Sequence, residues 1–178
     1  MRNDRHAFWA IAFKTIIVHT VTYFFVGLLA FLLLDYSKKF AQHGLAVYMR
    51  QTDDPWVMAG PLFQPLRGLI FASVFYPLQG ILFRHKRGWL LMWWLLVAIG
   101  ALSTFGPSPS SIEGMIYSRL SVKEHLLGLP ELLAQTLLFS IVLSYWVRYP
   151  EKRWVNWVLG TLFVVVLLLP VLGLLTRT

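Results

Sequence analysis

Long apolar runs constrain the fold of this chain more than any other feature of its sequence. A helix that crosses the hydrocarbon core of a bilayer needs about 20 mostly apolar residues, and several runs approach that length. They are Ile16–Leu34 (extending back to about Phe8), Gly60–Phe83, Trp89–Phe105, Leu129–Val147 and Trp154–Leu175. Because a chain in lipid must satisfy its backbone hydrogen bonds internally, such runs predict helices. We expect an all-α integral membrane bundle of about five transmembrane helices, with residues 1–178 as a single transmembrane domain.

Composition indicates that lipid is the solvent for most of the chain. Hydrophobic residues make up 57% of the sequence and charged residues 13%, whereas a soluble domain carries roughly 25% charged residues. The formal net charge of +8 would suggest nucleic acid in a soluble protein, but the basic residues lie between the apolar runs. We therefore expect no nucleic-acid binding. The absence of cysteine excludes disulfides, thiolate catalysis and cysteine-ligated metal sites.

Basic residues predict the orientation in the membrane. Short basic segments between apolar runs face the cytoplasm, and the strongest is Arg84–Arg87, followed by Arg148–Arg153. They place the N-terminus inside and the C-terminus outside. The basic start of the chain resembles a signal peptide, but the apolar run behind it is too long, so we expect a retained first helix. The outer loops are then about Tyr36–Ala59 and Gly106–Gly128.

Prolines interrupt the second apolar run. Pro61 and Pro65 fall in its first turns, where the loss of a backbone donor is tolerated. Pro77 lies deeper in the run. We expect Pro77 to kink the helix, which a membrane bundle accepts when neighbouring groups satisfy the freed carbonyls.

Polar residues within the apolar runs are the candidates for a functional site, because charge inside a membrane is costly. Arg67 lies about two turns into the second run behind Gln64, and Glu131 begins the fourth run with Gln135 one turn deeper. Two interpretations remain open: a polar site that binds a ligand head group or moves a proton, or an ion pair that fixes helix packing. We expect a carboxylate, from Glu113 or Glu131, to neutralise Arg67.

The outer loop Phe105–Ser118 combines prolines, glycines and serines, which forbid a continuous helix. Glu113 and Tyr117 lie in it among apolar residues and complete the set of ligand-binding candidates. Glu113 can cap a short helix that begins near Ser110 or Ser111, or it can turn inward. We expect either an ordered loop that dips back between the helices to line a cavity, or an ordinary surface loop with proline turns.

No residue pattern predicts catalysis or a cofactor. The sequence contains no His-Glu-x-x-His, Gly-x-Ser-x-Gly or Walker motif, and the loop serines have no obvious base unless His125 approaches them in space. His19 lies within the first apolar run, and a b-type haem usually needs two axial histidines. We expect His19 to be buried and hydrogen-bonded, Lys14 to reach the inner surface, and the protein to hold no metal and no cofactor.

Three blocks of sequence resemble small polytopic membrane proteins of bacteria that carry no assigned activity. They are Pro65–Phe71, Phe105–Gly114 and His125–Glu131, and the resemblance spans most of the chain. It implies the bacterial inner membrane as the location. It transfers no functional residue to this sequence.

These features favour a non-catalytic subunit or helper that binds a lipid-like ligand or partner helices. Membrane lipids are the expected partners, together with other membrane-protein subunits. The alternative is a small transporter or an intramembrane enzyme, with a polar site at the outer face built from Arg67, Glu113 and Glu131. A polar cavity that holds these three residues and opens to the outside favours the alternative, whereas a dry, closed ion pair favours the first function.

Overall fold

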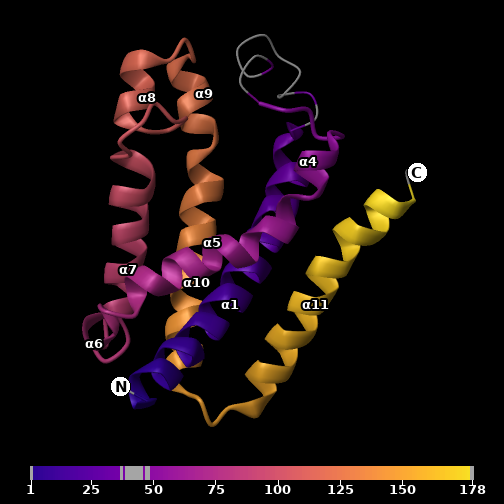
Figure 1. Cartoon of the computed structure of the whole chain (residues 1–178). Coiled ribbons are helices and arrows are strands. Elements are labelled where there is room, and N and C mark those ends of the chain that lie inside the picture. The colour runs from indigo at the N-terminus through magenta and orange to yellow at the C-terminus, as the bar shows by residue number, and fades with distance from the viewer. Residues whose placement is uncertain (1, 37, 39–45, 47–48, 177–178) are drawn as a thin grey trace.

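Helices form all of the regular structure that is described (Figure 1). The computed structural model describes residues 2–36, 38, 46 and 49–176. The longer helices are α1 (Arg2–Leu34), α5 (Gly60–Phe75), α7 (Gly88–Val97), α10 (Leu129–Arg148) and α11 (Arg153–Leu175). The shorter segments are α4 (Pro55–Met58), α6 (Gln79–Leu82), the π-helical turn η1 (Ala98–Leu102), α8 (Ile112–Tyr117) and α9 (Val122–Leu127). The predicted all-α fold is confirmed for this part of the chain.

Three helical stretches are long and apolar enough to cross a membrane. They are His6–Leu34, Val122–Arg148 and Arg153–Leu175. A further apolar stretch, Gly88–Leu102, is shorter, and α5 has 16 residues. The prediction of helices suited to a membrane is therefore confirmed, while the number of five crossings stays a prediction. Residues 37, 39–45 and 47–48 of the predicted outer loop Tyr36–Ala59 lie outside the described residues.

Helix α1 lies at the centre of the bundle and packs against α5, α10 and α11, while α7 packs against α10. The apolar core between these helices includes Ile17, Val18, Phe75, Leu82, Met92, Phe139, Leu143 and Trp146. Gly68 of α5 permits a close approach to α1, because a β-carbon at position 68 would lie 2.7 Å from the Cα atom of Ile16. Small residues at such contacts let the backbones of membrane helices come together.

Helix α5 ends at Phe75, and the expectation that Pro77 kinks a continuous second helix is wrong. The last hydrogen bond of α5 runs from Tyr76 N to Ala72 O at 2.9 Å. Pro77 follows with no backbone N–H to continue the series. The chain turns at this point and resumes as α6, so the predicted run Gly60–Phe83 consists of two helices. The third predicted run also changes geometry, where α7 passes into the π-helical turn η1.

The bundle has two distinct ends (Figure 1). One end carries the N-terminus, α6 and the turn between α10 and α11, and the other carries α4, α8, α9 and the C-terminal end of α11. The first end also holds the segments Arg84–Arg87 and Arg148–Arg153, so we call it the basic end. We call the opposite end the cleft end, for the feature described below.

Hydrogen bonds close the basic end. The Arg148 guanidinium donates to the backbone carbonyls of Phe83 at 3.0 Å and Lys86 at 3.2 Å, and also to the carbonyl of His85. These bonds hold the turn after α6 against the last residue of α10. A basic side chain suits this position because carbonyls at a helix C-terminus lack partners within the helix.

Two further side chains tie α1, α10 and α11 together at the same end. The Lys14 ammonium donates to the backbone carbonyl of Trp146 at 2.8 Å, and the indole of Trp146 donates to Asn156 Oδ1 at 2.6 Å. Lys14 therefore binds a carbonyl of the neighbouring helix α10 and is part-buried, where we had expected it to reach the inner surface. At the basic end, these side-chain hydrogen bonds join α1 to α10 and α10 to α11.

Candidate functional site

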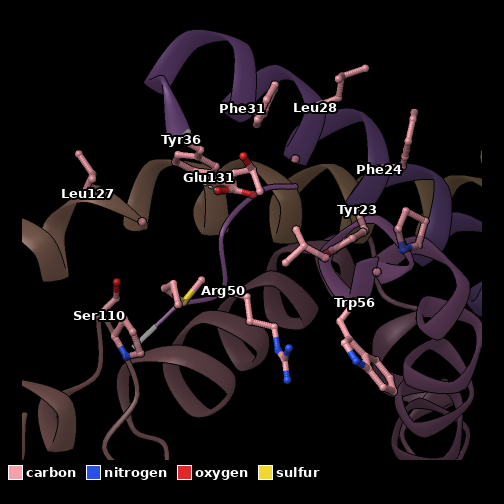
Figure 2. A pocket seen from close by; sticks show the side chains of 18 of the residues that line it. Tyr23, Phe24, Leu28, Phe31, Tyr36, Arg50, Trp56, Ser110, Leu127 and Glu131 are labelled. Atoms are coloured by element: carbon pink, nitrogen blue, oxygen red, sulfur yellow. Dashed lines mark hydrogen bonds between the residues drawn. The ribbon is translucent and has the colours of Figure 1, made fainter. Parts of the chain in front are cut away.

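A cleft opens at the cleft end, between the last turns of α1, helix α4 and the junction of α9 and α10 (Figure 2). Its volume is about 680 Å³. Its walls are mostly apolar, with Phe24, Leu28 and Phe31 from α1, Trp56 and Val57 from α4, and Leu127 from α9. Concave apolar sites with a few polar groups are the usual places where proteins bind small molecules.

Glu131 and Tyr36 form a polar contact inside the cleft. The Tyr36 hydroxyl donates a hydrogen bond to Glu131 Oε2, across 95 positions of the sequence. The bond joins the end of α1 to the first turn of α10, where the N-terminus of the helix favours a negative charge. Burial, and then the hydrogen bond to the Glu131 carboxylate, raises the pKa of Tyr36. The hydroxyl therefore keeps the proton that it donates.

Arg50 and Asp54 lie on the side of the cleft formed by α4. The Arg50 guanidinium is 3.0 Å from the Asp54 carboxylate and 6.0 Å from the centre of the Trp56 ring. Asp54 is also the N-cap of α4, since its side chain accepts a hydrogen bond from the backbone N–H of Trp56 at 2.8 Å. That backbone bond, and then Arg50, lowers the pKa of Asp54. The charge of Arg50 is thus balanced by its neighbour.

Of the six residues proposed from the sequence as a polar site, only Glu131 lines this cleft. Gln135 lies half-buried farther along α10, Glu113 is half-buried on α8, and Tyr117 is exposed on α8. Gln64 is buried within the bundle, and Arg67 is exposed on α5. The cleft therefore does not bring Arg67 and Glu113 together with Glu131.

The predicted salt bridge between Arg67 and Glu113 or Glu131 is wrong for the residues that are described. Helix α5 buries a stripe of Gln64, Gly68, Ala72 and Phe75. Arg67 falls on the exposed side of that helix instead, and its guanidinium lies 5.7 Å from the centre of the Phe71 ring. The sequence shows the charge but not which face of the helix carries it.

His19 is buried and hydrogen-bonded, as predicted. Gln64 donates through Nε2 to the carbonyl of Gly60 at 3.1 Å, so its Oε1 faces His19 Nε2, which donates to it at 3.1 Å. The rings of Phe71 and Phe139 pack edge-on against the imidazole. Gln64 therefore acts as the hydrogen-bond partner of His19 within the core, and it does not reach the cleft.

The loop before α9 is ordered around His125. Its Nδ1 accepts the backbone N–H of Ser110 at 3.0 Å, and its Nε2 lies 3.2 Å from the Ser118 hydroxyl. Because Nδ1 is an acceptor, the neutral ring carries its proton on Nε2 and donates it to Ser118. A general base needs a free lone pair toward the hydroxyl, so this pair fastens the loop and does not activate a serine.

The short helix expected near Ser110 or Ser111 is present as α8. Its N-cap is Ser111, whose hydroxyl accepts the backbone N–H of Gly114 at 2.9 Å. The cap is therefore a serine, and Glu113 lies beside it in the first turn. Among the described residues, no group of three His, Asp or Glu side chains is placed to hold a metal ion.

Sequence reasoning missed Tyr36 and Arg50 as part of the candidate site. An Asp-Pro pair at positions 54 and 55 marks the start of a helix, and that signal could have directed attention to α4 and to Arg50 four residues before Asp54. No local pattern links Tyr36 to Glu131, because their contact depends on how α1 and α10 pack.

Comparison of the chain with known protein families, with curated proteins and with solved structures finds no match. The resemblance to small polytopic membrane proteins of bacteria therefore stays a prediction. The functional proposal is therefore based on the shape and the polar groups of the cleft.

Proposed function

We propose that this chain is a non-catalytic protein of the bacterial inner membrane that binds a lipid-like amphiphile in the cleft, as a subunit or helper. The observation that carries the proposal is a cleft of about 680 Å³ whose apolar walls surround the Tyr36–Glu131 pair. An amphiphile fits this combination of apolar walls and a polar pair, because its hydrocarbon chain can lie against the apolar side chains while its head group reaches the carboxylate.

The proposed topology has five crossings, with the N-terminus in the cytoplasm and residues 1–178 as one transmembrane domain. Three of the five crossings are the stretches His6–Leu34, Val122–Arg148 and Arg153–Leu175, and we propose α5 and the stretch Gly88–Leu102 as the other two. The 16 residues of α5 span about 24 Å, less than a hydrocarbon core of about 30 Å, so a crossing by α5 requires local thinning of the bilayer. The basic segments favour the cytoplasm for their end of the bundle.

The polar groups of the cleft support binding in preference to a reaction. Glu131 accepts a hydrogen bond from a tyrosine that keeps its proton. Ser110, which also lines the cleft, donates its hydroxyl to the backbone carbonyl of His125 at 2.5 Å. That hydroxyl is engaged in holding the loop, so it is not poised as a nucleophile.

Gly27→Leu tests the proposal. A β-carbon at position 27 would lie 3.7 Å from Glu131 Oε1, an ordinary contact, so the rest of the leucine side chain extends into the cleft. Gly100→Leu in η1 is the matched control, because no atom lies within 4 Å of a β-carbon there and the position is exposed. The measurement is the rise in melting temperature when phospholipid is added to the chain in nonionic detergent.

We expect the wild type and Gly100→Leu to gain stability equally from added lipid, because a ligand that binds the folded state raises its stability. Gly27→Leu should gain much less, since its side chain occupies the space for the ligand. Equal gains in all three proteins contradict the proposal.

A small transporter is the second candidate, and the ionisable Glu131 in the cleft is the observation that favours it. A carboxylate open to the cleft can take up and release a proton as a substrate passes. Liposomes that contain the protein and a pH-sensitive dye distinguish the two functions. A proton flux that the wild type supports and Glu131→Gln loses favours transport, and the absence of any flux favours binding alone.

A further inference from the structure

The charges that line the cleft are not balanced. The described lining holds one basic residue, Arg50, and two carboxylates, Glu124 and Glu131. The Arg50 guanidinium is 3.0 Å from the Asp54 carboxylate, and Glu124 accepts hydrogen bonds from the backbone N–H and the hydroxyl of Ser121. In Figure 2 that guanidinium points away from Glu131. Glu131 forms no salt bridge within the described part of the chain. Among the described residues, the Glu131 carboxylate thus lies in the cleft without a basic partner, in a protein whose formal net charge is +8.

Glu131 also has acceptor capacity that the described residues leave unused. An ionised carboxylate offers about four lone-pair positions, and the Tyr36 hydroxyl takes one of them on Oε2. Oε1 faces Gly27, at 3.7 Å from where a β-carbon would be. Both Gly27 and Glu131 line the cleft, so the missing side chain at position 27 leaves this oxygen accessible from the cleft.

Aromatic rings in the cleft wall add a second attraction for a cation. Tyr23, Tyr36 and Trp56 all line the cleft (Figure 2). The face of an aromatic ring attracts ammonium and guanidinium groups, and Trp56 already lies beside the guanidinium of Arg50. Aromatic rings together with carboxylates are the side chains that recognise an alkylammonium group, whereas an anionic head group would meet the negative charges of Glu124 and Glu131.

We infer that the amphiphile bound in the cleft carries an ammonium head group, with Glu131 as its counter-ion and the hydrocarbon chain along Phe24, Leu28 and Phe31. The inference rests on the proposed function of the cleft and specifies the ligand class. It selects an aminolipid over lipids with a neutral or an anionic head group. The ammonium hydrogen bonds to Oε1, and Tyr36 holds the carboxylate in position through Oε2.

Three probes with the same twelve-carbon chain test the inference: dodecylammonium, whose N–H groups can donate to Oε1, dodecanol and dodecyl sulfate. Binding of each to the full chain in nonionic detergent is measured by native mass spectrometry, below the concentration at which the probe forms its own micelles. The net charge of +8 favours the sulfate wherever binding is unspecific. A preference for the ammonium probe must therefore come from a local negative site.

We expect the ammonium probe to bind the wild type roughly tenfold more tightly than dodecanol, the factor given by one charged contact, and the sulfate probe to bind most weakly. Glu131→Gln should remove the preference. Glu113→Gln should keep it, because Glu113 is a carboxylate outside the cleft. Equal binding of ammonium probe and dodecanol, or a preference that Glu131→Gln leaves unchanged, overturns the inference.

The Gly27→Leu variant separates this inference from the proposed function. If the probes show no head-group preference but Gly27→Leu weakens the binding of all three, the cleft binds an amphiphile and the ammonium assignment is wrong. If Gly27→Leu changes no binding, or if no probe binds the wild type, the proposed function and the inference both fail.

Discussion

The two ends of the bundle use their polar groups in different ways. At the basic end, Arg148 binds carbonyls of the turn after α6, and Trp146 reaches Asn156 at 2.6 Å. At the cleft end, the Tyr36–Glu131 hydrogen bond joins α1 to α10, and a cleft of about 680 Å³ separates these helices from α4. Hydrogen bonds join the helices at the first end, whereas a cleft separates α4 from α1 and α10 at the other.

This difference indicates how a small bundle can keep an open site. A cleft loses the packing contacts that would otherwise stabilise its walls, so the helices that form it must be fixed elsewhere. Helices α1 and α10 contribute to both ends. The hydrogen bonds of α1 and α10 at the basic end fix the position of these helices, and so of the cleft walls. Substitutions at the two ends should therefore change the stability of the protein by different amounts.

The largest expected loss of stability comes from Arg148→Ala, which removes the hydrogen bonds of the guanidinium at the basic end. Hydrogen bonds to a charged group contribute roughly 1.5–3 kcal/mol each, and the variant leaves several carbonyls of the 83–86 turn without their donor. We expect the stability to fall by at least that amount in thermal unfolding in detergent. The control is Arg84→Ala, at an exposed position in the same turn, with a change below about 0.5 kcal/mol. Equal effects of the two variants contradict the bracing role.

Gly68→Ala probes the contact between α1 and α5 that both ends share. The added methyl group would lie 2.7 Å from the Ile16 Cα, and overpacking of this kind costs about 1–3 kcal/mol. Gly160→Ala serves as the control, because its β-carbon meets no atom within 4 Å and alanine favours a helix over glycine by about 1 kcal/mol. We expect the first variant to lose stability and the second to gain slightly. If both variants gain stability, α1 and α5 lie farther apart than the contact between Gly68 and Ile16 requires.

Tyr36→Phe removes the hydrogen bond at the cleft end and should lower stability by about 1 kcal/mol at neutral pH. Folding raises the pKa of Tyr36, so its contribution is complete below the ordinary tyrosine pKa of about 10 and is lost as the pH rises above that value. The variant should therefore show a shallower decline than the wild type above about pH 10. Tyr117→Phe, exposed on α8, is the control for loss of a tyrosine hydroxyl at neutral pH. A pH profile of Tyr36→Phe identical to that of the wild type contradicts the contact.

The smallest expected effect belongs to Arg67→Met. Arg67 is exposed and has no salt bridge among the described residues, so its loss should change stability by less than about 0.5 kcal/mol. Combination with Glu131→Gln should be additive within about 0.3–0.5 kcal/mol. A larger coupling energy between the two substitutions would support the Arg67–Glu131 salt bridge that the sequence predicted.

The sequence predicted the long helices well where an apolar run ends abruptly. The runs Leu129–Val147 and Trp154–Leu175 became Leu129–Arg148 and Arg153–Leu175, because the charged turn between them cannot enter the apolar bundle. Prediction was less successful in the second run. There Pro77 ends α5 instead of bending it, a choice that depends on what the following residues can pack against.

The candidate site could be predicted only in part. Glu131 was identifiable as a charged residue at the start of an apolar run, and it lines the cleft. Its partner Tyr36 is 95 positions away, and the pairing results from the packing of α1 against α10. Arg67 and Gln64 are three residues apart on one helix, yet one is exposed and the other is buried. The long apolar runs give too little periodicity to tell such faces apart.

The most direct test of the account is to map where an amphiphile contacts the protein. A lipid with a photoactivatable group in its hydrocarbon chain is cross-linked to the full chain in detergent, and the labelled residues are identified by mass spectrometry. The account predicts labelling concentrated at Phe24, Leu28, Phe31 and Val57, and its loss in Gly27→Leu. Labelling spread evenly over the exposed faces of α7 and α11, unchanged by Gly27→Leu, would contradict the claim that the cleft is a binding site.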